Sequence, residues 1–410
     1  MVAVGTRPAR LLRSVDEALE HVHAICFKTG PPARLGVELE WTVHHHHDLR
    51  RPLHARDLRA ALGHHAPHSL DPGGTPRPLP HGGVVTVEPG GQIEISTRAH
   101  TSLTALHRST TADIDYLAAR IARHGLTLGP HGIDPYRPPR RILHTFRYDA
   151  MAAAFARRGA SGGIMMCATA ATQVCLDAGT PAQLRARWEA VHALGPPLLA
   201  LFATSGHHAG RDTGWASARM RAWLTLDPAR TRPVGVAPDP ALAWARYALA
   251  APVLCVRTPH GPWRPDPGVS FAEWINGGLS PAPTVDDLDY HLSTLFPPVR
   301  PRGYLEVRYL DAQPPDRWFA PVAVLAALLA DDATTGAARD LAAPVAGAWE
   351  TAARRGLADP GVRGAATAIA DLACRALDRT GLPRGLREAV ADDVSRRLAG
   401  GGSDRCRHRR

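Results

Sequence analysis

The chain has 410 residues, of which 45% are hydrophobic, and its formal net charge is +10. This length and apolar content allow a large buried core and exclude a disordered or fibrous protein. No stretch reaches the roughly 20 apolar residues that a membrane-spanning helix needs, and the first residues lack the pattern of a signal peptide. We therefore expect a cytoplasmic protein without membrane contact.

The six cysteines and the basic residues narrow the function further. The cysteines are scattered without CxxC spacing, so we expect reduced thiols and no zinc knuckle or disulfide framework. The arginines are spread along the whole chain without an aromatic-interleaved basic motif, which argues against nucleic acid as a partner. Because Lys28 is the only lysine, positive charge facing a phosphate must come almost entirely from arginine, whose planar fork grips two oxygens at once.

In chain order, the first predicted element is a helix over residues 14–27, with Ser14 and Glu17 spaced as a capping box. Residues 34–43 then alternate between apolar and polar, which predicts a strand with Glu38 and Glu40 on its polar face.

Residues 44–83 hold the run His44–His47 and a Pro/Gly-rich stretch, and we expect an irregular excursion in which the histidines form a solvated loop. Residues 84–88 and 92–97 predict two strands of a hairpin, with Glu94 on the polar face of the second. A helix is predicted over residues 103–124.

The second half predicts two further strands and many helices. Residues 164–176 predict a strand that carries Gln173, and residues 303–310 predict one with Tyr304, Glu306 and Arg308 on one face. Helices are expected over residues 181–203 and 239–250. From about residue 316 to 399 the pattern is helical, with breaks near Gly336, Pro360 and Pro383.

The polar faces of the predicted strands carry the chemistry. A single glutamate on such a face is usually just solvated, but a sheet with one face packed on helices and the other lined by carboxylates describes a basin for cations. Oxygen ligands without cysteine or paired histidines favour magnesium with a nucleotide over zinc. The residues concerned are Glu38, Glu40, Glu94, Gln173 and Glu306, with Arg308 beside them.

Several motifs, in the same order, resemble the plant-like and actinobacterial glutamate-cysteine ligases, and in particular the actinobacterial enzymes that make γ-glutamylcysteine for ergothioneine biosynthesis. The resemblance spans about residues 30 to 330 and is most specific at EPGGQxE and YLEVR. The matching segments are GVELE (36–40), EPGGQIE (88–94), MM (165–166) leading to TQV (172–174), RAW (221–223), FAEW (271–274), residues 291–297 and YLEVR (304–308).

The resemblance implies a glutamine synthetase-like α+β fold, in which a curved, mainly antiparallel sheet forms a funnel with helices packed outside. It implies ATP and Mg²⁺ as cofactors. Magnesium would be held by Glu38, Glu40, Glu94, Gln173 and Glu306, with Glu88 as a further candidate. Arg308 and Arg221 would be catalytic and contact ATP or substrate together with Gln92, Arg147 and Tyr304.

By the same resemblance, ATP would phosphorylate the γ-carboxylate of glutamate, and the amine of cysteine would attack the acyl phosphate. Residues 1–330 would form the catalytic domain, 331–399 a helical region packed on it, and 400–410 a disordered basic tail. We expect small-molecule partners only, namely glutamate, cysteine and ATP, and no obligate protein partner.

Three alternatives stay open at this point. The first is an ATP-dependent carboxylate-amine ligase with another amine acceptor, because acceptor choice depends on pocket shape. The second is a non-catalytic relative, against which the intact glutamates argue. The third, suggested only by net charge, is a nucleic-acid-binding protein.

Overall fold

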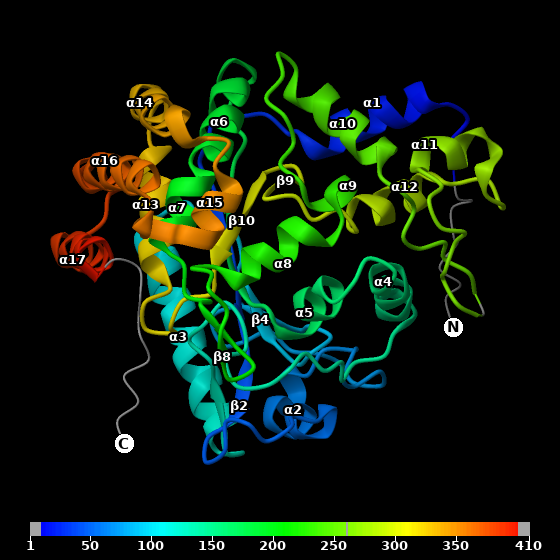
Figure 1. Ribbon diagram of the computed structural model, residues 1–410, viewed down its shortest axis with the longest axis horizontal. Helices are drawn as coiled ribbons and strands as arrows, with labels where there is room; N and C mark the ends of the chain where they lie inside the picture. Colours follow the sequence, from blue (N-terminus) through cyan, green and yellow to red (C-terminus); the bar gives the residue numbers. More distant parts are fainter. Residues whose placement is uncertain (1–9, 260, 401–410) are drawn as a thin grey trace.

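The computed structural model describes residues 10–259 and 261–400, and a six-stranded sheet lies at its centre (Figure 1). The strand order is β3-β4-β1-β6-β10-β9, and every neighbouring pair is antiparallel. An antiparallel sheet with helices packed on it confirms the predicted α+β class. The strands are β1 Leu35–Trp41, β3 Val84–Val87, β4 Ile93–Ser96, β6 Ala171–Leu176, β9 Val299–Pro301 and β10 Leu305–Asp311.

The alternation of β1 decides which face of the sheet is the core. Val37, Leu39 and Trp41 are buried in the main hydrophobic cluster, so Glu38 and Glu40 point to the opposite face. Helices α3 (Leu103–Ala122), α7 (Gly195–Leu201) and α13 (Phe319–Leu328) pack on the apolar face, on the left of the sheet in Figure 1. On the right, the polar face is covered by α4 (Phe146–Ala156), α5 (Ser161–Ala168) and α8 (Ala218–Leu226).

Further elements surround this centre. The strands are β2 Val43–His45, which pairs with β5 Leu126–Leu128, and β7 His207–His208, which pairs with β8 Arg211–Asp212. The helices are α1 Val15–Cys26, α2 Ala55–Leu62, α6 Pro181–Ala193, α9 Pro228–Thr231, α10 Pro240–Ala250, α11 Phe271–Glu273, α12 Val285–Leu292, α14 Asp332–Ala342, α15 Trp349–Arg355, α16 Pro360–Ala376 and α17 Arg384–Gly400. Short 3₁₀ or π turns are η1 Gly63–His65, η2 Trp274–Gly278, η3 Ala343–Val345, η4 Gly356–Ala358 and η5 Leu377–Thr380.

The C-terminal helices share the core of the sheet, since one hydrophobic cluster includes residues from Leu12 to Val394. The breaks predicted at Pro360 and Pro383 are confirmed, but the break near Gly336 is wrong, because α14 runs through it. The helix begins after Asp331, whose side chain accepts a hydrogen bond from the Thr334 amide and so caps the first turn. A glycine costs a helix only about 1 kcal/mol, which this cap and the packing outweigh. The predicted tail falls mostly on residues 401–410, which lie outside the described residues.

The predicted strand over residues 164–176 is half wrong. Its first part forms helix α5, and only Ala171–Leu176 forms strand β6. A short apolar run without clear alternation suits a buried helix as well as a buried strand, so periodicity alone could not separate them.

The histidine run is only partly a solvated loop. His46 and His47 are exposed, whereas His44 and His45 are buried in strand β2. The His44 ring contacts the Thr42 hydroxyl at 2.9 Å, and burial lowers its pKa to about 4. His44 is therefore a neutral core residue. The excursion also contains helix α2, which was not predicted.

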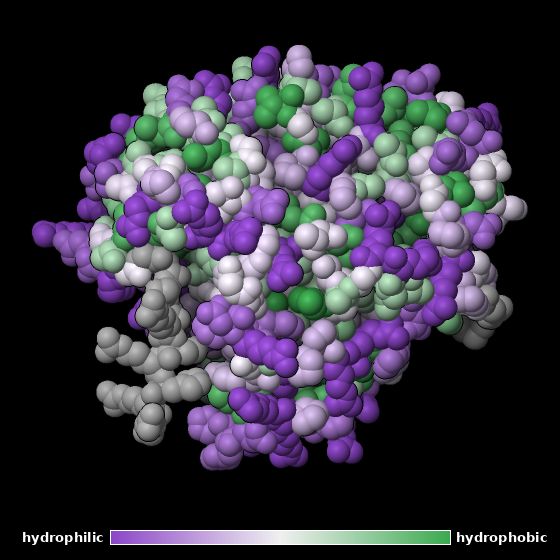
Figure 2. Space-filling model, in the orientation of Figure 1, coloured by the Kyte–Doolittle hydropathy of each residue, from purple (hydrophilic) through white to green (hydrophobic). Residues whose placement is uncertain are grey.

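Within the described ranges, no single helix is long and apolar enough to cross a bilayer, although the sharply bent pair Phe319–Leu328 and Asp332–Val345 passes by length and composition. Helix α13 of that pair is buried against the sheet. On the face shown in Figure 2, hydrophobic side chains are scattered among hydrophilic ones.

Candidate active site

A cavity of about 280 Å³ lies on the polar face of the sheet. Its floor comes from β1, β4, β6 and β10, and its cover from α4, α5 and α8. Seven of the residues predicted from the sequence meet there: Glu38, Glu40, Gln92, Glu94, Arg147, Gln173 and Arg308. Glu88, the further candidate, lines it too.

The register of β1 and β4 places two carboxylates directly against each other, because Glu40 is the partner of Glu94. Like charges at directly opposed positions destabilise a sheet. The carboxylates are held by hydrogen bonds: Gln173 donates to Glu40 at 2.7 Å, and Thr86 donates to Glu94 at 2.7 Å. Hydroxyl and amide donors carry no net charge, and among the described residues no arginine or histidine forms an ion pair with either carboxylate.

The turn between β3 and β4 brings Glu88 and Gln92 to the same place. Gly90 lies so close to the Cys167 carbonyl of α5 that a Cβ atom would overlap it, and Gly91 has a φ of +93°, a conformation that favours glycine. The two glycines of EPGGQIE therefore let this turn pack against the cover of the cavity.

Four glutamates in the cavity have raised pKa values. Burial, followed by repulsion from neighbouring carboxylates, raises the pKa of Glu38, Glu40, Glu88 and Glu94 from 4.5 to about 7. Arg308 lowers each of these pKa values, but less than burial and the repulsion between carboxylates raise them. A hard divalent cation would supply the missing charge, and carboxylate and amide oxygens are its preferred ligands.

These raised pKa values predict that the metal-free protein loses stability as the pH rises. A folded-state pKa above the unfolded value contributes stability that is complete below pH 4.5 and is lost as the pH passes through about 7. We expect the free energy of unfolding to fall between pH 6.5 and 8 with a chelator present, and to fall less with saturating Mg²⁺. Denaturant unfolding at several pH values, with and without Mg²⁺, measures this free energy. An equal slope with and without Mg²⁺ would contradict the cation site.

The interval from pH 6.5 to 8 lies above the pH range in which buried histidines change the stability in the opposite direction. Burial lowers the pKa of His44 and His192 to about 4 and that of His291 to about 3. Their contribution to stability is complete above pH 6.5 and is lost only as the pH falls toward the folded values.

Glu306 has a different environment from the other glutamates. It is completely buried beneath the cavity, directly opposite Arg300 in the pairing of β10 with β9. Arg300 donates to both of its oxygens, at 2.7 and 3.2 Å, and Arg308 and Arg302 donate at 2.8 and 3.3 Å. Burial alone would raise the pKa of Glu306, but the arginines outweigh it and hold that pKa well below its usual range.

Four donated hydrogen bonds use all the lone-pair directions of the Glu306 carboxylate. For Glu306 to bind a metal ion, one arginine must therefore release it. Arg302 has the longest of these contacts, at 3.3 Å, and its side chain is 48% exposed, so it is the one that can turn away.

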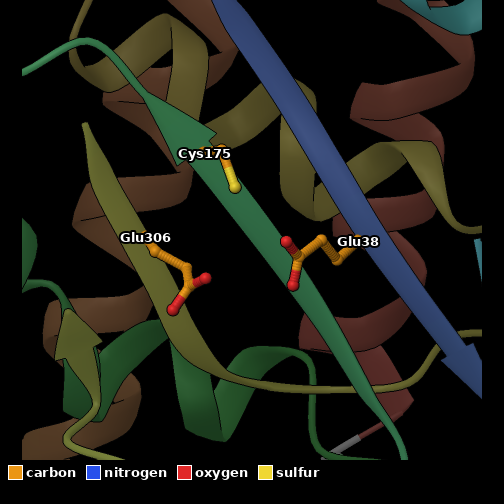
Figure 3. Close-up of side chains that lie close together, drawn as sticks. All are labelled: Glu38, Cys175 and Glu306. Atoms are coloured by element: carbon orange, nitrogen blue, oxygen red, sulfur yellow. The ribbon is translucent and has the colours of Figure 1, made fainter. Parts of the chain in front are cut away.

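Figure 3 shows that Glu38, Cys175 and Glu306 project from three neighbouring strands toward one point. One possible ligand atom from each lies within 4.8 Å of those of the other two. Burial and then the two carboxylates raise the pKa of the Cys175 thiol well above its usual value, so the thiol is neutral. Magnesium favours oxygen over sulfur, so this neutral thiol would be a poor ligand for it.

Three predicted residues do not line the cavity: Glu306, which lies beneath it, Arg221 and Tyr304. Arg221 is on the exposed side of α8, where its guanidinium carbon lies 5.3 Å from the centre of the Trp215 ring. Tyr304 is half-buried just before β10 and neighbours Cys175 and Arg302 rather than the open space.

Arg147, by contrast, lies between the cavity and a second hollow. It donates to the Ser293 hydroxyl and carbonyl at 3.0 and 2.9 Å, and it lines both the cavity and a neighbouring hollow of about 420 Å³. Phe146, Trp263 and Tyr290 give this hollow aromatic walls, and His144 lies at its edge. A ligand too large for the cavity could extend past Arg147 into it.

Sequence reasoning missed Arg300, Arg302 and Trp223, all of which line the cavity. A signal for the two arginines was present, because their spacing in the segment RPRG places both beside the YLEVR strand across a tight hairpin. The proline and glycine concealed strand β9.

The site thus combines carboxylates that need a cation with arginines beside them. Such an arrangement can hold the phosphates of a nucleotide and offset the negative charge that accumulates when a phosphoryl group is transferred to a carboxylate. Among the residues that line it there is one serine, Ser293, and no lysine or glycine.

Comparisons with known proteins agree with this chemistry. The family model of glutamate-cysteine ligase family 2 matches residues 34–404. The chain is 40% identical to glutamate-cysteine ligase EgtA of Mycolicibacterium smegmatis, covering 95% of this chain and 93% of that protein. It is 31% identical to the chloroplastic glutamate-cysteine ligase of Arabidopsis thaliana over 63% of this chain and 51% of that one.

A solved structure supports the fold. The glutamate-cysteine ligase of Francisella tularensis, in complex with AMP, superimposes with a TM-score of 0.52 at 14% identity, over 92% of this chain and 83% of that one. Because the family model covers nine-tenths of the sequence and the EgtA match spans both proteins, this chain belongs to glutamate-cysteine ligase family 2.

Proposed function

We propose that this enzyme joins the γ-carboxylate of glutamate to the amine of cysteine at the expense of ATP, with Mg²⁺, and releases ADP and phosphate. The observation that carries the proposal is the opposed pair Glu40 and Glu94, which has no ion-pair partner among the described residues, next to the arginines around Glu306. Family membership and the EgtA match support the same reaction.

Glu38, Glu40, Glu94 and Gln173 are the residues that would hold magnesium, with Glu88 at the edge of the same group. Bound there, magnesium offsets charge on the phosphates and on the reacting carboxylate. Glu306 contributes chiefly by orienting arginines, and it becomes a ligand only if Arg302 releases it. Arg221 does not line the cavity and loses its predicted catalytic role. Arg308 keeps this role and Arg300 joins it, because these two arginines line the cavity.

The reaction needs no protein nucleophile. A γ-carboxylate oxygen of glutamate attacks the terminal phosphorus of ATP and ADP leaves, which creates an acyl phosphate with a good leaving group. The cysteine amine then attacks the acyl carbon, the C–O bond to phosphate breaks, and the amine loses a proton. The protein positions these groups and stabilises the developing charge.

The acceptor and the biological setting belong to the proposal. Cysteine is favoured over another amine because the relatives are named glutamate-cysteine ligases. Supply of γ-glutamylcysteine for ergothioneine and a cytoplasmic location, where ATP and reduced cysteine are at hand, are the setting we propose.

A direct assay tests this reaction. We expect purified protein with ATP, Mg²⁺, glutamate and cysteine to form ADP, phosphate and γ-glutamylcysteine in equal amounts, and omission of Mg²⁺ or glutamate to abolish phosphate release. A panel of other amines at equal concentration serves as the control for acceptor choice. AMP and pyrophosphate as products would rule out the acyl phosphate, and faster turnover with another amine would replace cysteine as the acceptor.

A further inference from the structure

Arg219 is a buried arginine on α8 that does not line the cavity. Its side chain is only 2% exposed. One terminal nitrogen donates to the main-chain carbonyl of Arg308 at 2.7 Å, and the other lies 3.8 Å from the carboxylate of Asp311. A charge buried to this degree is costly unless its contacts are specific, and both contacts reach β10.

Strand β10 is irregular at the point that Arg219 touches. Its register with β6 shifts between Val307 and Leu310, so that Arg308 and Tyr309 together stand opposite a single residue of β6. A bulge of this kind disrupts the ladder of hydrogen bonds and re-aims a side chain. The Arg219 guanidinium supplies the donor for the Arg308 carbonyl within the bulge.

The side chains of the two arginines meet at one indole ring. The guanidinium carbons of Arg219 and Arg308 each lie 5.6 Å from the centre of the Trp223 ring. Trp223 lines the cavity. Each cation is attracted to the ring, so Arg219 is coupled to Arg308 through the indole as well as through the backbone.

Asp311 anchors the other end of the arrangement. Its carboxylate accepts hydrogen bonds from the hydroxyls of Ser205 and Ser217, at 2.6 and 2.9 Å, and from the Thr204 amide at 2.9 Å. Ser217 is also the N-cap of α8, where its side chain accepts from the Met220 amide. The start of α8 and the end of β10 are therefore joined on both sides of Arg219.

We propose that Arg219 is a positioning residue: it holds the bulge of β10 and the Trp223 ring so that the Arg308 side chain is aimed at the transferred phosphate. The proposal rests on the function proposed for Arg308. Arg308 donates to Gln173 and Glu306 in this geometry, and a small shift of an oriented charge in an active site is costly to the rate.

The test is a double-mutant cycle with Arg308. The pair Arg219→Met with Asp311→Asn removes both charges at once, so that neither is left buried alone. We expect it to lower turnover about tenfold, which is about 1.4 kcal/mol of barrier. In an Arg308→Ala background the same pair should have little further effect, because an arginine that acts only through Arg308 loses its target.

Arg187→Met is the matched control. Arg187 is also a buried arginine with main-chain partners, the carbonyls of Leu329 and Asp177, but it lies on α6, away from the cavity. Its loss should lower stability while turnover is retained. Losses that add in the Arg308→Ala background would overturn the proposal, because they would show a general structural effect.

A second readout does not depend on activity. We expect hydrogen exchange of the amides in residues 305–311 to rise about tenfold in the Arg219→Met, Asp311→Asn pair, with β1 unchanged. Unchanged hydrogen exchange in β10 would overturn the proposal that Arg219 holds the bulge. If Arg308→Ala alone leaves turnover intact, the function proposed for Arg308 fails, and the exchange result still decides whether Arg219 holds the bulge.

Discussion

Replacement of Glu38 by glutamine is expected to lower turnover about 100-fold, which is about 2.7 kcal/mol of barrier. The change removes a negative charge from the group that would hold magnesium, and so misplaces the phosphates. The same change should stabilise the metal-free protein, because burial and repulsion from Glu94 and Glu306 raise the pKa of Glu38 to about 7. We expect a gain of about 1 kcal/mol at pH 8.

Turnover and denaturant unfolding, each measured with Mg²⁺ and with chelator, test this pair of effects. Glu350→Gln is the control, because Glu350 is exposed on α15 and does not line the cavity. Near-normal turnover of Glu38→Gln would mean that these carboxylates do not hold a metal ion needed for the reaction.

Replacement of Glu306 by glutamine is expected to act in the opposite direction on stability. Glu306 is fully buried and is held by Arg300, Arg302 and Arg308, so loss of its charge leaves these arginines to repel one another. Breaking a buried ion pair typically costs about 3 to 5 kcal/mol, and we expect a loss near the lower value because glutamine keeps some hydrogen bonds. Turnover should also fall about 100-fold, because Arg300 and Arg308 lose their common anchor.

Denaturant unfolding at pH 8 without metal measures the difference between the two variants. The pKa of Glu306 is held low, so its stabilising effect is complete above pH 4.5 and is lost only in strong acid. A Glu306→Gln protein as stable as the wild type would contradict the arginine cluster.

Much of the sheet could be predicted from the sequence because its strands alternate. In β1 and β10 the period of two separates core residues from polar ones, and the EPGG turn marks the hairpin of β3 and β4. The predictions are wrong or incomplete where alternation is absent. Residues 161–168 form a helix inside an apolar run, and β9 lies hidden between a proline and a glycine.

The candidate site shows the same division. Glu38, Glu40 and Glu94 were found because each occupies the polar face of an alternating strand, and Gln173 was found in the TQV segment; all four line the cavity. Arg221 was chosen from a motif alone, and the structure places it on the outer side of α8. About half a turn of helix separates exposed Arg221 from Trp223, which lines the cavity, and the weak periodicity of residues 218–226 did not show which side faces inward.

The sequence by itself determined which residues carry charge and which strand faces they occupy, because the side-chain period of a strand is a local property. Only the tertiary structure decided which charges meet. Strand register sets Glu40 against Glu94, where two like charges call for a cation, and sets Glu306 against Arg300, where the charge is already offset. The glutamates are chemically identical, but Glu94 faces a carboxylate from a distant segment whereas Glu306 is held by arginines of its own hairpin, so their pKa shifts and their effects on stability are opposite.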